Sequence, residues 1–74
     1  MIYFKLRSDK LFHEDCGDYL SYGMDIFDRR NDLLIRSIPD ISVQRTALEQ
    51  LIMQCNKSCV DIIHIDDIIE DFLL

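Results

Sequence analysis

Residues 61–74 read D-I-I-H-I-D-D-I-I-E-D-F-L-L, and the spacing of their apolar side chains decides how the chain folds. Wound as an α-helix, the stretch gathers its apolar residues within one arc of about 140°. That arc contains Ile62, Ile65, Ile68, Ile69, Phe72 and Leu73. The opposite side contains Asp66, Asp67, Glu70 and Asp71. The pattern predicts an amphipathic helix, capped by Asp61, that packs its apolar stripe on the rest of the chain and turns an acidic side outward.

A second helix is predicted before this one, with Ser42 as its N-cap and its end near Cys55. Its apolar residues again share one side of a helical wheel. They are Ala47, Leu48, Leu51, Ile52 and Cys55. Asn56 follows, and asparagine tolerates the left-handed conformation that ends many helices. Residues 57–60 then connect the two helices.

Three earlier stretches alternate apolar and polar residues, as half-buried strands do. They are residues 2–7, 19–28 and 33–38. Residues 8–17 are expected to form a polar connection, in which Leu11 and Phe12 either prolong the first strand or tuck inward. Residues 28–32 are expected to form a turn that joins the last two strands as an antiparallel hairpin. Gly23 inside the second strand indicates a bulge or a close backbone approach, and Pro39 is expected to end the third strand.

The expected fold class is α+β, with a three-stranded antiparallel β-meander followed by two α-helices packed on one face, in the order β-β-β-α-α. Residues 1–74 are expected to form a single small domain, because a chain of 74 residues leaves no room for two cores. A chain of this size buries only about 60% of its unfolded surface. Such a domain is marginally stable and often needs a partner.

The side of the sheet that faces away from the helices is a candidate interaction surface. It is expected to carry Tyr3, Tyr19 and Phe27, together with Leu34 or Ile38. If these side chains are exposed, they form a patch for self-association or for a partner. The alternative is that the amino-terminal loop folds over them.

The net charge of −6 originates in the terminal helix. Residues 1–57 carry nine acids and eight bases, whereas residues 58–74 carry five acids and neither Lys nor Arg. A protein that binds a phosphate backbone needs a basic stripe, so nucleic acid is not expected as a partner. The acidic side is either a solvated surface or a docking surface for a basic protein. A decoy that imitates nucleic acid is a further interpretation, and it rests on charge alone.

The sequence favours a cytoplasmic protein that does not contact a membrane. The amino-terminal residues M-I-Y-F-K-L-R are too short and too charged for a signal peptide, and no apolar run approaches a membrane-spanning length. Cys16, Cys55 and Cys59 are an odd number of cysteines without a disulfide framework. Reduced thiols are therefore expected.

Residues that could bind a metal or act as nucleophiles are few. His13, Cys16, Cys55, Cys59 and His64 are of the types that zinc prefers, but they lack the paired spacing of structural zinc sites. The carboxylates of the terminal helix lack a loop that wraps calcium, and no third residue is evident to orient His64 beside Cys59. Neither an enzyme nor a cofactor is expected. The alternative function is a small zinc-binding or thiol-based regulator that uses these five residues.

Three short motifs carry a resemblance to a known family. Tyr22-Gly23-Met24, Asp40-Ile41-Ser42 and residues 64–72 match Y-G-[IM], D-I-S and H-[LI]-x-D-[VI]-[VI]-E-D-F in this order. The chain resembles a family of short uncharacterised proteins from clostridia-type Firmicutes over about residues 19–74. Many members have Ser-Pro where this chain has Asp61-Ile62, which keeps a cap but loses the proline. The family is catalogued as a domain of unknown function, so the resemblance implies a bacterial cytosolic source and no activity.

Together these patterns favour a non-enzymatic protein-interaction or regulatory module that binds an unknown protein partner or forms a homodimer. The candidate partner-binding residues are Asp66, Asp67, Glu70 and Asp71 on the acidic side and Tyr3, Tyr19 and Phe27 on the sheet.

Overall fold

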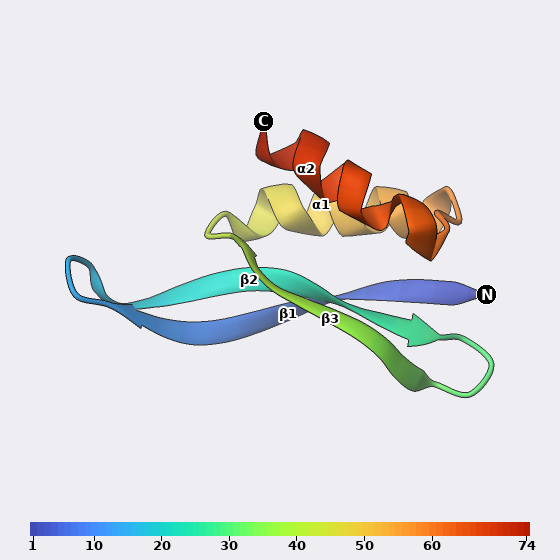
Figure 1. The fold of residues 1–74 in the computed structure, drawn as a ribbon, viewed down its shortest axis with the longest axis horizontal. Helices are drawn as coiled ribbons and strands as arrows, with labels where there is room; N and C mark the ends of the chain where they lie inside the picture. The colour runs from blue at the N-terminus through green and yellow to red at the C-terminus, as the bar shows by residue number, and fades with distance from the viewer.

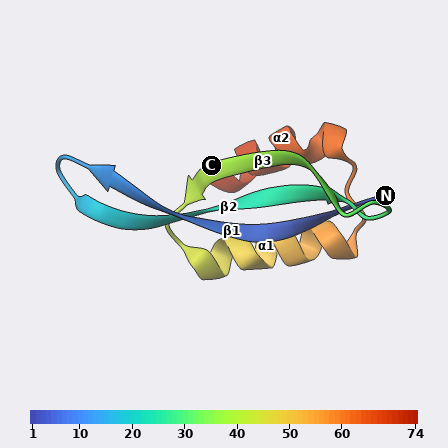
Figure 2. The same ribbon diagram turned by 90° about the horizontal axis from the view of Figure 1, so that it is seen from below.

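The computed structural model describes all 74 residues and places three strands before two helices along the chain (Figure 1). The elements are β1 (Ile2–His13), β2 (Gly17–Asp28), β3 (Leu33–Ser42), α1 (Arg45–Lys57), a short 3-10 helix η1 (Ile62–His64) and α2 (Ile65–Leu73). The sheet is antiparallel in the order β1-β2-β3. Both helices lie over one face of it, α1 toward β1 and α2 toward β3 (Figures 1 and 2). The predicted α+β class and β-β-β-α-α order are confirmed.

One cluster of nine buried side chains joins the helices to the sheet. It consists of Phe4, Met24, Ile26, Ile41, Leu48, Ile52, Cys55, Ile65 and Ile69. The strand members alternate with outward residues, and the helix members recur every three or four residues, as the two periodicities require. The apolar stripes recognised in the sequence are therefore the surfaces that form this core.

The β1–β2 hairpin is longer than the sequence predicts. The prediction of a polar connection over residues 8–17 is wrong, because cross-strand pairing continues to His13 and Gly17 and leaves a short turn at residues 14–16. Gly17 adopts a positive φ of 71° at the end of this turn. Residues 8–13 carry several polar side chains because no helix covers this part of the hairpin (Figures 1 and 2). Their alternation is only between half-buried and exposed side chains, so it imposes a weak apolar pattern on the sequence.

Strand β3 continues past Pro39, so the prediction that this residue ends it is also wrong. The ladder pairs Met24 with Ile38 and Tyr22 with Ser42, and the unequal spacing is a bulge in β3 opposite Gly23. A Cβ atom on Gly23 would lie 2.1 Å from the carbonyl oxygen of Ile38. The predicted bulge and close backbone approach at Gly23 are confirmed, and Pro39 is tolerated because it lies in a bulge of an edge strand.

The first residues of both helices differ from the prediction. Helix α1 begins at Arg45, and Gln44 at its N-cap position forms no side-chain cap hydrogen bond. Ser42 does not cap the helix; its Oγ accepts a hydrogen bond from the Gln44 N–H at 3.0 Å in the turn before α1. Asp61 does act as a cap, but of η1, where it accepts from the Ile63 N–H at 3.2 Å.

Helix α1 ends in a Schellman arrangement. The Val60 N–H donates to the Cys55 carbonyl at 3.1 Å, and the Cys59 N–H donates to the Asn56 carbonyl. Cys59 therefore occupies the left-handed position, with φ of 53°, in place of the Asn56 suggested by the sequence. This position favours glycine, because a side chain there is crowded by the backbone.

Replacing Cys59 with glycine is expected to stabilise the protein by about 1 kcal/mol, because it removes the cost of a left-handed non-glycine residue. The free energy of unfolding, measured by urea titration, tests this. Cys59→Ala is the matched control, since it removes the thiol but keeps the strained conformation, and its stability should match that of the unmodified protein. Equal stability of the glycine and alanine variants would contradict the argument.

Asn56 instead forms a contact that the sequence does not reveal. Its side chain accepts from the Phe4 N–H at 2.8 Å and donates to the Phe4 carbonyl at 2.9 Å. Strand β1 is an edge of the sheet, so these backbone groups of Phe4 have no neighbouring strand. The amide of Asn56 satisfies both, and it thereby ties the end of α1 to the edge of β1.

Candidate interaction surfaces

The face of the sheet opposite the helices carries a row of apolar side chains. Phe4 and Ile26 are buried under the helices, so their neighbours Tyr3 and Phe27 point to the uncovered face. Tyr3 pairs with Phe27 in the ladder, and their rings stack with centroids 5.2 Å apart. Phe27 pairs in turn with Leu34 on β3. We call these three residues, with the adjacent bulge residue Ile35, the apolar row.

The apolar row is exposed on its β3 side and held in place on its β1 side. Leu34 and Ile35 are 55% and 48% exposed. The Tyr3 hydroxyl donates a hydrogen bond to Asp32 Oδ1 across the β2–β3 turn. This bond raises the pKa of Tyr3, because it favours the protonated phenol. The ring of Tyr3 is therefore fixed before any partner arrives.

Two basic side chains lie over the rings of the apolar row. Lys5 Nζ is 5.6 Å from the centroid of Phe27, and the guanidinium carbon of Arg29 is 5.8 Å from the centroid of Tyr3. Neither cation forms an ion pair within the chain. The rim of the apolar row is thus cationic, with two charges available to a carboxylate from outside.

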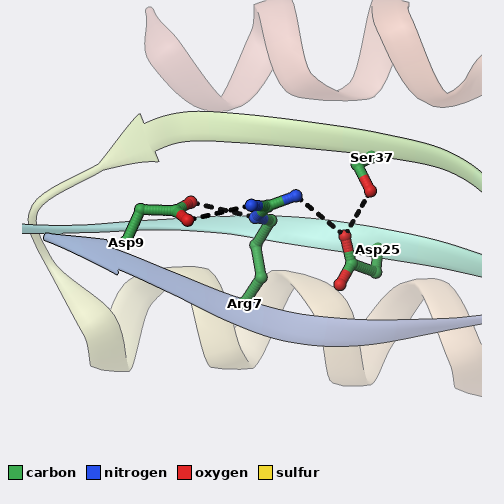
Figure 3. Close-up of polar contacts among 4 residues, drawn as sticks. All are labelled: Arg7, Asp9, Asp25 and Ser37. Atoms are coloured by element: carbon green, nitrogen blue, oxygen red, sulfur yellow. Dashed lines mark hydrogen bonds and ion pairs between the residues drawn. The ribbon is translucent and has the colours of Figure 1, made fainter.

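The middle of the same face is polar and internally satisfied (Figure 3). Arg7 donates to both oxygens of Asp9 at 2.9 Å and to Asp25 Oδ1 at 3.3 Å. Ser37 Oγ donates to the same Asp25 oxygen at 2.7 Å. The Arg7 guanidinium lowers the pKa of Asp9 through its hydrogen bonds. The charge of Arg7 is thus paired with those of Asp9 and Asp25 within the chain. This polar cluster lies between the apolar row and the far end of the hairpin.

Tyr19 and Ile38 do not join the apolar row. Tyr19 pairs with Leu11 near the hairpin tip and is eight residues from Phe27 along β2, about 26 Å in an extended strand. Ile38 packs against the core on the helix side, so of the two residues expected on the outer face, Leu34 or Ile38, it is Leu34 that lies there. The bulge at Ile35 reverses the direction of the side chains that follow it.

The predicted acidic side of α2 is exposed, and one of its carboxylates is engaged. Arg36 on β3 donates to both oxygens of Asp66, at 2.7 and 3.1 Å. Asp67, Glu70 and Asp71 are exposed and form no ion pair within the chain. Three carboxylates therefore remain available, in place of the four that the sequence suggests.

The Arg36–Asp66 pair gives a prediction about pH. The hydrogen bonds from Arg36 lower the pKa of Asp66, so the pair's stabilising effect is complete above the ordinary Asp pKa and is lost as the pH falls through the lowered value. Arg36→Gln is expected to raise the pKa of Asp66 toward its ordinary value. Carboxyl chemical shifts followed by NMR from neutral to acid pH measure this directly. An unchanged midpoint for Asp66 in the variant would contradict the pairing.

The five residues of the zinc or thiol alternative are spread over the molecule. Cys55 is in the core, where burial raises the pKa of its thiol and disfavours the reactive thiolate. His13 and Cys16 lie at the hairpin tip, whereas Cys59 and His64 lie between the helices along the chain. No three His, Cys, Asp or Glu side chains form a group that could hold a metal ion.

A hollow of about 450 Å³ lies at the far end of the hairpin. It is lined by His13, Cys16, Tyr19, Leu20 and Val43. The sequence did not indicate this hollow, because it depends on the extension of β1 and β2 beyond the end of β3. No helix of the chain combines the length and the apolar character needed to cross a membrane.

Comparison with known proteins gives a family and no function. The model of the family described as "Family of unknown function (DUF6514)" matches residues 1–74. No curated protein and no solved structure shows significant similarity to the chain. The match extends over the amino-terminal strand as well as the motifs of β2, β3 and the helices. This chain therefore belongs to the DUF6514 family, whose function is unknown.

Proposed function

We propose that this protein is a non-enzymatic interaction module that binds another protein through the apolar row of its sheet. The observation that carries the proposal is the continuous apolar surface formed by Tyr3, Phe27, Leu34 and Ile35 on a face that no helix covers. Contiguous exposed apolar surface is the usual mark of a protein-binding site. The unpaired cysteines fit action in the reducing cytoplasm.

The fixed geometry of the apolar row supports this role. Binding costs free energy when side chains must be ordered at the interface. Here Tyr3 is already held by the stack on Phe27 and by the hydrogen bond to Asp32. Aromatic side chains that are ordered beforehand are typical anchors of binding energy. The partner therefore gains apolar contact at low entropic cost.

The rim of the apolar row defines the chemistry of the partner. Lys5 and Arg29 flank the rings, and neither forms an ion pair with a carboxylate of its own chain. A partner that presents apolar side chains bordered by Asp or Glu would satisfy both cations and cover the row. The acidic side of α2 lies on the helix layer, away from this face, and a basic partner bound there is the competing interpretation (Figure 1).

Partner capture with matched variants tests the proposal. The full chain is immobilised and cross-linked to proteins in an extract of the source cell, and the captured proteins are identified by mass spectrometry. Leu34→Thr/Ile35→Thr is expected to lose the partner, because threonine keeps strand propensity but removes apolar surface. Leu73→Gln removes an exposed apolar side chain (60% exposed) from α2, and it should keep the partner.

A further variant separates the two surfaces. Asp67→Asn/Asp71→Asn removes charges from the acidic side and should also keep the partner. Capture that is unchanged by Leu34→Thr/Ile35→Thr, or lost only with the acidic-side variant, would overturn the proposal. Circular dichroism establishes that each variant is folded before its result is interpreted.

A further inference from the structure

The far end of the β1–β2 hairpin lacks a third strand. Pairing between β2 and β3 ends at Tyr22 and Ser42, whereas pairing between β2 and β1 continues to Gly17 and His13. In the backbone ladder, residues 17–21 of β2 are therefore paired only with residues 9–13 of β1. The side chain of Ser21 is buried and donates to Asp40 Oδ1 of β3 at 2.6 Å, so the edge of β2 is open at residues 17–20. Figures 1 and 2 show this hairpin extending well beyond the helices and β3. We call residues 9–13 and 17–21 the distal ribbon.

The distal ribbon carries apolar side chains on both faces. Leu11 pairs with Tyr19 on one face, and Phe12 and Leu20 lie on the other, where they are 70% and 54% exposed. An isolated two-stranded ribbon is marginally stable at best in water. Its exposed apolar side chains and the free edge of β2 both favour an added strand.

The backbone at the free edge of β2 is oriented for such a strand. The Phe4 N–H and carbonyl face away from β2, because they bond to Asn56. The β1–β2 register is continuous, so every second pair shares this orientation. The Phe4–Ile26 pair is a non-hydrogen-bonded pair of the β1–β2 ladder. Every second pair from it is of the same kind, which includes Lys10 with Leu20 and Phe12 with Asp18. The N–H and carbonyl groups of Asp18 and Leu20 therefore point to the free edge.

From these features, we infer that two copies of this chain pair antiparallel through residues 17–21 of β2. A two-fold axis at Tyr19 places each Asp18 opposite Leu20 of the second copy, and these are the residues whose backbone groups face the edge. The two distal ribbons then form one four-stranded sheet. The contact is isologous, so the same residues of both copies form it and it closes as a dimer.

The register of this dimer is limited by the end of β3. In this register, Gly17 of the second copy lies opposite Ser21. The residue before Gly17 cannot pair with Tyr22, because Ser42 of β3 is already paired with Tyr22. The hairpin tip of the second copy instead meets residues 42–45 at the start of α1. The hollow lined by Tyr19, Leu20 and Val43 lies at this junction and receives the incoming strand.

The charges at this junction are complementary. The tip carries Glu14 and Asp15, both exposed. Helix α1 starts without a side-chain cap at Gln44 and has no acidic residue in its first turn, which begins with Arg45. Carboxylates are stabilising near a helix N-terminus. The negative charges of Glu14 and Asp15 in each copy therefore lie where they stabilise the N-terminus of α1 in the other copy.

The chain exposes more area than a compact protein of its mass. The surface measures 5375 Å². A compact monomer of 8.8 kDa is expected to expose about 4,800 Å² by the scaling of area with mass. The excess of roughly 600 Å² accompanies an elongated shape of 41 × 26 × 19 Å, in which the distal ribbon protrudes from the helices and β3. The inferred dimer interface uses residues outside the apolar row, so it goes beyond the proposed function and leaves that row open.

Sedimentation equilibrium over a range of concentrations tests the dimer. The unmodified protein is expected to self-associate reversibly in the micromolar range. Leu20→Pro removes two symmetry-related N–H donors from the interface and is expected to weaken the dimer at least about tenfold. Lys10→Pro is the matched control, because the Lys10 N–H faces the outer edge of β1, and it should leave the association unchanged.

Cross-linking provides a readout that does not depend on the proline variants remaining folded. In the Cys16→Ser/Cys59→Ser background, Tyr19→Cys places two thiols on the axis, at a Cα separation of about 4.5 Å in this class of pair. That separation permits a disulfide, so diamide should convert the protein to a covalent dimer. Leu11→Cys, on the same face but away from the axis, should remain monomeric.

Three results would overturn the inference directly, and a fourth would do so by placing the contact elsewhere. The first three are a protein that stays monomeric at the highest soluble concentration, a dimer equally weakened by both proline variants, and equal cross-linking at Tyr19→Cys and Leu11→Cys. A dimer dissolved by Leu34→Thr/Ile35→Thr but not by Leu20→Pro would place self-association on the apolar row. That result would reject the ribbon contact, and it would place a second copy of the chain, in place of another protein, on the apolar row.

Discussion

Replacing Gly23 with alanine is expected to lower the free energy of unfolding by at least about 3 kcal/mol. The added Cβ would lie 2.1 Å from the Ile38 carbonyl oxygen and 2.9 Å from the Pro39 Cα. Both contacts are with backbone, so relief requires β2 and β3 to separate at the bulge. A domain of this length is stable by only about 4–11 kcal/mol, so the loss is a large fraction of the total. Urea titration followed by circular dichroism measures it.

Gly17→Ala is the matched control for this prediction. Gly17 has a positive φ of 71°, but a Cβ there would meet nothing within 4 Å. Replacing Gly17 with alanine is therefore expected to lower the free energy of unfolding by only about 1 kcal/mol, which is the cost of a residue with a side chain at a positive φ. Equal losses at Gly23 and Gly17 would show that the close approach of β3 to Gly23 does not exist in solution.

Asn56→Ala is expected to destabilise the protein by about 2–3 kcal/mol, because it leaves the partly buried N–H and carbonyl of Phe4 without partners. The Asn56 amide forms both hydrogen bonds in the folded chain, at 2.8 and 2.9 Å. Alanine has the higher helix propensity, so any local effect on α1 opposes this loss. The measurement is again the free energy of unfolding in urea.

Gln54→Ala provides the comparison, since Gln54 is an exposed residue of the same helix whose side chain forms no hydrogen bond within the chain. Its replacement should change stability by less than about 0.5 kcal/mol. Hydrogen exchange adds a local readout, because the Phe4 amide should lose protection in Asn56→Ala while the amides of β2 keep theirs. Retained protection of Phe4 would contradict the role of Asn56 at the edge.

These two sites connect the architecture to the surfaces proposed for binding. Gly23 allows β3 to approach β2 closely, and Asn56 covers the free edge of β1 near its start. The free edge of β2 at residues 17–20 has neither device, whereas Ser21 is already bonded to Asp40 of β3. Natural sheets protect edges that must stay unpaired. In the inferred dimer, the second copy pairs with this uncovered edge of β2.

The candidate surfaces were only partly predictable from the sequence. Alternation identified Tyr3 and Phe27 on the face away from the helices, and the helical wheel identified the acidic side of α2. Neither pattern could place Leu34 and Ile38 on opposite faces. Both residues are even-numbered in one strand, and a bulge of one residue at Ile35 is needed to reverse the side chains that follow. A bulge depends on the partner strand, so a single strand's pattern does not contain it.

The sequence alone determined the number, order and type of the main elements, because burial on one side imposes a period of two on strands and of about 3.6 on helices. It also determined the acidic character of α2 and the close approach at Gly23. Tertiary structure decided the rest: the distal ribbon, the passage of β3 beyond Pro39, the Arg36–Asp66 pair and the contact of Asn56 with Phe4. These features join residues 30 or 52 positions apart, or lie where no core imposes a pattern. The stabilising contacts of these features involve residues that are distant in the sequence. The local periodicity of the sequence therefore cannot predict them.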